Sequence, residues 1–446
     1  MIIRMMFTAV VLIFVLQLHA TGQQTGAHQP LKITLKEAVE LALKHNHAVR
    51  IASFHVEEQQ HAKEVARSGY LPLLRNDSFF FHVTDTQFIE LPAGALGGGI
   101  PSVSTIVNQG GRTFATSGTG LTQPVTQLFK VRAANDVARA EVAASREKTR
   151  GTENDVALKV RGLYYKILVV ESQRRAIEAK IAAVEEQKTE RVQEVQYGSA
   201  LEVDLIESRA QSLQTKQELL TTEFQISDLR LQFNDVVGLP IKSEVALDPD
   251  VPVPGDSCER EQCVKLALEA HPEIAEARAL VQKASAGVRA AQREYIPDVE
   301  AFARYSYQNN VPFLARNFGT FGVHLGYDLF DGGKKQATIR ERNSQLEQAK
   351  ENLARISDEI EVSVQSAYNR LERTKQMVAV SQELLAQRRE ARRVSAQQLE
   401  RGAYLRSQAA AAVAQEFEAQ TLLLQSQLEY AQAQNELTHA IGRTAP

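Results

Sequence analysis

The stretch Gly326–Lys335, GYDLFDGGKK, comes nearest to a chemical motif in this chain of 446 residues. A phosphate-binding loop has a glycine five residues before its Gly-Lys pair and a serine or threonine directly after the lysine. Asp328 and Lys335 occupy those two positions, so the stretch does not predict nucleotide binding. Its glycines therefore need a structural explanation.

Other residue types that could do chemistry lack the necessary spacing. Metal ligands on one helix face are three or four residues apart, and no pair among the N-terminal histidines has that spacing. The chain also contains no G-x-S-x-G nucleophile motif and no pair of acids in a context that forms a cleft. We therefore predict that the protein is not an enzyme and has no metal or other cofactor. The histidines concerned are His45, His47, His55 and His61.

The charge balance and the cysteines limit the function further. The formal net charge is −3, which gives no support for nucleic-acid binding. The two cysteines, Cys258 and Cys263, are close in sequence and have no nearby histidine, so they do not predict a zinc site. In an oxidising compartment they can form a disulfide, and two free thiols are the alternative.

The N-terminus indicates export. Arg4 precedes an apolar run from Met5 to Leu18, and small and polar residues follow around Ala20. This pattern is typical of a secretory signal peptide, which we place at about residues 1–20. The apolar run is short for a membrane-spanning helix, although an uncleaved anchor is the alternative.

The chain contains the same unit twice. Ala38–Val49 aligns with Cys263–Ile274 at an offset of 225, whereas Gly198 aligns with Gly402 at an offset of 204. The first copy thus has 21 extra residues (225 − 204), which we assign to the glycine-rich segment 91–111. Because the two copies align, we predict that both contain the same elements in the same order.

Each copy is predicted to contain two strands and two long helices. Apolar and polar residues alternate over Val299–Tyr307 and Phe321–Leu329, and these lengths suit tilted membrane strands. The first long helix carries a heptad seam, which predicts coiled-coil packing. Its seam residues are Val156, Val160, Leu163, Ile167, Val170, Ile177, Ile181 and Val184.

These patterns predict a mainly α protein with a β portion and long antiparallel coiled-coil helices. The expected boundaries are a first repeat at 31–240, a linker at 241–258 and a second repeat at 259–443. In the first repeat we expect strands at about 74–88 and 112–125, a long helix at 129–197 and a return helix at 200–237. In the second we expect strands at about 298–308 and 318–330, a long helix at 334–401 and a return helix at 403–441.

Four strands in one chain cannot close a barrel, and lipid does not tolerate open sheet edges. If the strands cross a membrane, several chains must therefore contribute to one barrel. Gly332 and Gly333 would then mark the junction where a strand continues into a helix, because glycine accepts positive φ.

Several sequence features, taken together, resemble the TolC-like outer membrane efflux proteins. They are the two-copy plan, Leu329–Ala337 (LFDGGKKQA), Gln123–Lys130 (QPVTQLFK) and the glycine turns Tyr197–Asp204 and Arg401–Gln408. The resemblance covers about residues 31–442. It implies a homotrimer whose α-helical barrel continues into one shared 12-stranded β-barrel in the lipid of the cell outer membrane. It also implies a helical tunnel through the periplasm that docks on an adaptor (membrane fusion) protein and an inner-membrane transporter.

The resemblance also assigns residues to the periplasmic tip. Gly198 and Gly402 match the helix-hairpin turns where adaptors engage, and Asp204 matches an acid that narrows the tunnel mouth. Glu207 adds an acid one turn later as a second candidate for the pore constriction. The second copy departs from the family pattern, because Gln408 and Ala411 stand where acids are frequent.

The sequence thus predicts a passive exit duct of a tripartite efflux or type I secretion system. The alternative is an exported structural coiled-coil protein without transport activity. That alternative explains the signal peptide and the heptads, but it leaves the matched strand pairs unexplained.

Overall fold

The computed structural model describes residues 31–85, 88–108, 111–250, 258–309 and 315–443. The predicted signal peptide lies outside the described residues. The chain divides into two compact units with interleaved segments. The first unit combines Met1–His45, Lys159–Val253 and Val380–Leu428, and the second combines Asn46–Leu158, Pro254–Ala379 and Glu429–Pro446.

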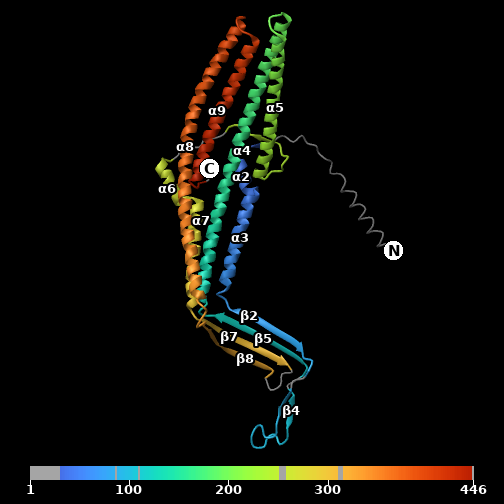
Figure 1. The fold of residues 1–446 in the computed structure, drawn as a ribbon, viewed down its shortest axis with the longest axis vertical. Helices are drawn as coiled ribbons and strands as arrows, with labels where there is room; N and C mark the ends of the chain where they lie inside the picture. The colour runs from blue at the N-terminus through green and yellow to red at the C-terminus, as the bar shows by residue number, and fades with distance from the viewer. Residues whose placement is uncertain (1–30, 86–87, 109–110, 251–257, 310–314, 444–446) are drawn as a thin grey trace, which may run out of the picture. The chain divides into compact units, whose positions relative to one another are not determined.

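The second unit contains an antiparallel sheet with strand order β2-β5-β7-β8 (Figure 1). Each repeat contributes two neighbouring strands, and β5 of the first repeat pairs with β7 of the second. The outer edges of β2 and β8 have no partner strand within the described chain. The strands are β2 (Leu73–His82), β5 (Thr113–Pro124), β7 (Asp298–Asn309) and β8 (Asn317–Gly326).

Two strands end earlier than the sequence indicated. β8 ends at Gly326 rather than at residue 330, because Gly326 pairs with Asp298, the first residue of β7. Pro297 precedes Asp298 and has no N–H to extend the ladder. β2 ends at His82 rather than at residue 88, and His82 pairs with Thr113, the first residue of β5.

The additional segment of the first repeat contains a hairpin that the sequence analysis treated as a loop. Strand β3 (Phe88–Leu91) ends at the first residue of this segment and pairs antiparallel with β4 (Thr105–Asn108) inside it. The connection between them contains four glycines with positive φ, at 94, 97, 98 and 99. The β-branched run Thr105-Ile106-Val107 was the available sequence signal for β4.

Long helices occupy most of the remaining chain, and none of the four longest contains a proline. No helix among the described residues is both long enough and apolar enough to cross a membrane. The longest helices are α4 (Leu128–Gln196), α5 (Glu202–Val237), α8 (Lys334–Glu400) and α9 (Arg406–Ala440). The shorter ones are α2 (Leu35–His45), α3 (His47–Ser68), α6 (Arg260–Ala270), α7 (Pro272–Gln292) and the 3₁₀ turn η1 (Arg293–Tyr295).

The two long first helices of the repeats are buried to different extents. In α4, residues on both sides of the heptad seam are also buried, such as Ala157, Tyr164 and Leu168. In α8, burial follows a narrow stripe that includes Val364 and Leu371. α4 is therefore enclosed by neighbouring helices, whereas most of α8 remains exposed in the single chain.

The segment that the sequence analysis assigned to a linker contains a short strand in the first unit. β6 (Val245–Leu247) pairs in parallel with β1 (Leu31–Ile33). The hydroxyl of the fully buried Tyr164 lies 3.0 Å from Ile33 O and accepts a hydrogen bond of 2.8 Å from Asp248 N. Tyr164 thus connects α4 by hydrogen bonds to the end of β1 and to the residue directly after β6.

Candidate functional site: the sheet faces and the helical turns

All the Asp, Glu and Arg residues of the four-stranded sheet lie on one face. The register places Arg75, Gly120 and Arg304 in one cross-strand row, with Asp77 two residues further along β2. Asp298 and Glu300 follow on the same face of β7 because side chains alternate with a period of two. We call this face the charged face.

The opposite face, which we call the apolar face, is exposed in the single chain. Tyr305, Phe321, Val323 and Leu325 share it, and the exposed fraction of Phe321 is 88%. A soluble monomer rarely exposes so continuous an apolar patch. The two faces therefore match a strand set with lipid on one side and water on the other.

A polar cluster on the apolar face explains why the alternation is noisy in the first repeat. Asn76 Nδ2 donates to Ser117 Oγ at 3.2 Å and to Thr119 Oγ1 at 2.8 Å. The Ser78 hydroxyl donates to Asn76 Oδ1 and lies 2.9 Å from Ser117 Oγ. These four side chains satisfy one another, which lowers the cost of placing them away from water.

The junction between the sheet and α8 is built by Asp331 and two glycines. Gly332 and Gly333 have φ of 68° and 85°, in the left-handed region that favours glycine. The Asp331 carboxylate accepts hydrogen bonds from Gly333 N and Lys335 N, both at 2.9 Å. The Lys335 N–H is the main cause that lowers the pKa of Asp331. Asp331 therefore acts as the cap of α8, a role that the sequence analysis missed although its position before Gly-Gly was the signal.

The turn between α4 and α5 and the start of α5 contain three of the predicted site residues. Gly198 has φ of 71° and lets the chain leave α4 in a left-handed conformation. Asp204 lies in the first turn of α5, and its carboxylate accepts a 3.0 Å hydrogen bond from Leu201 N. Glu207 is exposed one turn later. Asp204 thus has a capping role within its own helix.

The turn between α8 and α9 repeats this arrangement with different side chains. Gly402 has φ of 70°, and Gln408 Oε1 accepts a 3.4 Å hydrogen bond from Leu405 N. Gln408 therefore takes the capping position that Asp204 holds in the first copy. The change from acid to amide keeps the hydrogen bond and removes the charge.

A contact between α4 and the start of α9 joins the two hairpins within one chain. Glu190 Oε1 accepts a 2.9 Å hydrogen bond from Ser407 N, and Glu190 Oε2 accepts from the Ser407 hydroxyl. Ser407 is the second residue of α9, where backbone N–H groups lack helical partners and the helix dipole favours an anion. The sequence analysis missed Glu190 because one glutamate among many on a long helix carries no distinguishing pattern.

Cys258 and Cys263 form a disulfide with a Cα–Cα separation of 5.6 Å. Cys263 is fully buried in α6, within a core cluster that includes Ile274, Val364 and Leu437. The disulfide therefore holds the chain before α6 against the core of the second repeat.

The N-terminal histidines do not assemble into a site. His55 and His61 each contact a glutamate three residues later, Glu58 and Glu64, in exposed pairs. Among the described residues no group of three His, Cys, Asp or Glu side chains could hold a metal ion.

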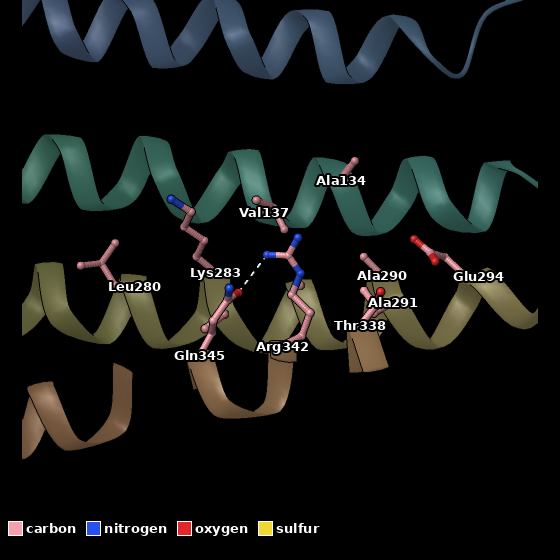
Figure 2. A pocket seen from close by; sticks show the side chains of 12 residues that line it. Ala134, Val137, Leu280, Lys283, Ala290, Ala291, Glu294, Thr338, Arg342 and Gln345 are labelled. Atoms are coloured by element: carbon pink, nitrogen blue, oxygen red, sulfur yellow. Dashed lines mark hydrogen bonds between the residues drawn. The ribbon is translucent and has the colours of Figure 1, made fainter. Parts of the chain in front are cut away.

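A cavity of about 440 Å³ lies between α4, α7 and α8 (Figure 2). Small residues of α7 such as Gly287 and Ala291 line it. Its two cationic side chains have partners, because Lys283 pairs with Glu141 at 2.5 Å and Arg342 donates to Gln345 at 2.8 Å. This cavity is therefore a packing groove between helices.

Comparisons with known proteins agree with these features. The family described as Outer membrane efflux protein matches residues 263–443. The outer membrane efflux protein BepC of Brucella suis biovar 1 (strain 1330) is 25% identical over 281 residues. The match covers 62% of this chain and 60% of that relative, so the chain spans less than two thirds of the length of this relative.

Solved structures match over nearly the whole chain. A membrane protein from Pseudomonas aeruginosa has a TM-score of 0.74 at 16% identity, covering 92% of this chain and 90% of that one. The outer membrane protein VceC from Vibrio cholerae has a TM-score of 0.72 at 15% identity, with coverages of 92% and 96%. The Campylobacter jejuni CmeC outer membrane channel has a TM-score of 0.73 at 13% identity, with coverages of 92% and 85%.

These solved structures share the fold of this chain, which consists of long helical hairpins and a small antiparallel sheet. Residues 263–443, most of the second repeat, match the family of outer membrane efflux proteins. The predicted resemblance agrees with this partial family match, and the predicted location in the cell outer membrane agrees with the names of these relatives. The mainly α architecture with a β portion is confirmed.

Proposed function

We propose that the protein is a passive exit duct through the outer membrane for a tripartite efflux or type I secretion system. In this proposal an inner-membrane transporter supplies the energy, and a periplasmic adaptor links the transporter to the duct. The duct itself catalyses no reaction and needs no cofactor. The match of residues 263–443 to the outer membrane efflux protein family supports this function over a purely structural coiled-coil role.

The observation that carries the proposal is the four-stranded sheet with one charged face, one apolar face and two unpaired edges. Unpaired edge groups cost several kcal/mol each in lipid, so β2 and β8 need partners from other chains. Three copies would supply 12 strands, an even number within the known range of such barrels. The charged face would then line the lumen, and the apolar face would contact lipid.

The oligomeric mass of detergent-extracted protein tests the proposal. Light scattering corrected for bound detergent is expected to give three chains, and the purified protein is expected to conduct ions across a planar lipid bilayer. A monomer or dimer that leaves the membrane fraction in salt or carbonate would contradict the duct and favour the structural role.

At the helical tips we propose that Gly198 and Gly402 lie in the adaptor contact and that Asp204 and Glu207 form an acidic constriction. Each left-handed glycine leaves one position of its turn without a side chain, and a Cβ there would meet no atom within 4 Å, so a partner hairpin can approach the backbone closely at that position. A ring of three Asp204 carboxylates around a common axis would select cations.

The constriction is tested by single-channel recording on a double variant, Asp204→Ala with Glu207→Ala. Cation selectivity is expected to fall, and unchanged conductance and selectivity would contradict the constriction. Asp204→Asn is the matched control for helix capping, because an amide oxygen can still accept from Leu201 N while the charge is removed. If charge is the cause, Asp204→Asn lowers selectivity as well.

A further inference from the structure

We propose that Arg304, together with Arg75, forms a positively charged band on the charged face that favours small anions and anionic solutes within the duct. The inference rests on the proposed function, because the charged face becomes a lumen wall only when the sheet closes into a barrel. Arg304 is then a selectivity-determining residue at the membrane end of the duct.

The strand register places the two arginines in one row. Arg75 of β2 and Arg304 of β7 are both paired with Gly120 of β5. In the next row on this face, Asp77 and Ser306 are both paired with Gly118. The two arginines are thus separated only by Gly120 of β5, which has no side chain.

The two glycines form a floor for the Arg304 side chain. A Cβ atom at Gly118 would lie 2.4 Å from Arg304 Nη2 and 2.5 Å from Nε, whereas one at Gly120 would lie 3.9 Å from Arg304 Cγ. The stem of Arg304 therefore passes Gly120, and its guanidinium lies flat over Gly118. Glycine weakens a strand interior and often marks a place where another group approaches closely. Because Gly118 and Gly120 have no side chains, the Arg304 side chain can lie along the surface of the sheet instead of projecting into the lumen.

The charge of Arg304 is not neutralised by the sheet. Asp77 Oδ1 accepts from Arg75 Nε at 2.8 Å, and within the part of the chain that the structure describes Arg304 makes no salt bridge. Arg75, Asp77 and Arg304 therefore leave a local charge of +1 per chain, which becomes +3 in a trimer.

The acids at the helical end of the sheet are too distant to cancel this charge. Asp298 pairs with Lys130 at 2.7 Å, and Glu300 Oε1 accepts from Gln127 at 2.8 Å. Glu300 lies four residues before Arg304, which is roughly 13 Å along a strand. That separation exceeds the screening length of about 8 Å at physiological ionic strength. The charge of Arg304 and the charges of Asp298 and Glu300 therefore act separately on ions that pass through the duct.

The test is the reversal potential of single channels of the full-length trimer in a planar bilayer under a KCl gradient. Arg304→Gln is expected to lower the chloride-to-potassium permeability ratio by about two-fold or more, because the uncompensated charge disappears. Arg304→Lys keeps the charge and is expected to keep the ratio. Arg316→Gln is the matched control, since Arg316 is exposed in the connection before β8 and outside the proposed band.

Gly118→Ala tests the glycine floor separately. The added Cβ must displace the flexible end of Arg304 away from the wall, so we expect a lower single-channel conductance with the charge retained. Each variant is also measured on the Asp204→Ala, Glu207→Ala background, because an acidic constriction in series would mask the band.

The outcomes separate this inference from the proposed function. A conducting channel in which Arg304→Gln and Arg316→Gln shift the reversal potential equally, or in which neither shifts it, would overturn the anion band alone. A trimeric wild-type protein that forms no channel would overturn the duct and the band together.

Discussion

At the scale of single residues, the two repeats use different side chains for the same helix start. Asn46 is the N-cap of α3 and accepts a 2.8 Å hydrogen bond from Ala48 N. At the equivalent position 225 residues later, His271 is the N-cap of α7, and its Nδ1 accepts from Glu273 N at 3.3 Å. An imidazole nitrogen can accept only when it is unprotonated, so the second repeat has a pH-sensitive cap.

The pH dependence of stability is expected to follow His271. Burial is the main cause that lowers the pKa of His271 to about 4, the nearby His439 and Arg150 contribute in the same direction, and Asp155 opposes them. Because the unfolded chain binds the proton more readily, stability is complete above about pH 6.5 and falls as the pH drops toward 4. The loss from this group is at most about 3 kcal/mol. Thermal melting followed by circular dichroism at pH 7, 5.5 and 4 measures it.

The matched variant is His271→Asn, which installs the cap that the first repeat already uses. It is expected to melt with a smaller difference between pH 7 and pH 4 than the wild type. An equal acid shift in both proteins would show that other groups cause the acid sensitivity.

A second prediction at this scale concerns Gly442. Its φ is 80°, and an added Cβ would lie 2.6 Å from His271 Cα, which is backbone and cannot move aside easily. Gly442→Ala is therefore expected to destabilise the protein by about 2–4 kcal/mol, combining left-handed strain with overpacking. Chemical denaturation in detergent provides the measurement.

Gly402→Ala is the control for backbone strain alone. Its φ of 70° is similar, but an added Cβ would meet no atom within 4 Å. We expect a cost of about 1 kcal/mol there. Equal costs at both positions would mean that the close approach to His271 contributes nothing.

At the scale of elements, Glu190 provides one of several polar contacts between the hairpins α4–α5 and α8–α9, which also include Ser172 with Thr421 and Asp155 with His439. Glu190 projects from α4 to the N-terminus of α9, so movement of either hairpin at this level must break the contact with Ser407. If the duct opens by a shift of its coiled coils, this contact opposes opening.

Glu190→Ala is accordingly expected to increase the open probability of single channels, because Ser407 N and its hydroxyl lose their acceptor. A hydrogen bond to a charged group contributes roughly 1.5–3 kcal/mol, enough for about a ten-fold change in a two-state equilibrium. Single-channel recording in a bilayer measures the open probability directly.

Glu202→Ala is the charge-matched control. Glu202 is exposed in the first turn of α5, and its substitution removes the same charge near the same helical turns. An identical rise in both variants would indicate a general charge effect rather than release of the contact.

At the scale of the whole molecule, α8 exposes large apolar side chains in the single chain. Val362, Met377 and Val380 on this helix are exposed by 68%, 47% and 70%. The equivalent helix α4 is enclosed by other helices of the same chain, so the exposed surface of α8 is consistent with burial against a second protomer.

Val362→Glu is expected to convert trimers to smaller species in detergent, because an unpaired carboxylate would be buried in the proposed interface at a cost of several kcal/mol. Light scattering measures the mass, and the helical circular dichroism signal checks that the chains remain folded. Ser363→Glu is the control on the adjacent exposed position. Trimers that persist in Val362→Glu would place the interface elsewhere.

The sequence alone predicted the features that depend on local pattern. The glycine turns and the alignment of the repeats, together with the heptad seam of the first long helix, located α4 and α8 to within about one residue of their observed ends. The repeat offsets paired Gly198 with Gly402, and both are left-handed. The glycine pair at 332–333 likewise marked the sheet-to-helix junction.

Tertiary structure alone decided the features that depend on contacts between distant residues. The pairing of β5 with β7 set which residues share the charged face, and no local pattern encodes a register between strands whose paired residues are more than 170 positions apart. Likewise β1 pairs with β6 across more than 200 residues, and Glu190 reaches Ser407 across 217. Periodicity is a property of a single segment, whereas register, capping across hairpins and the position of Arg304 over Gly118 result from how segments pack.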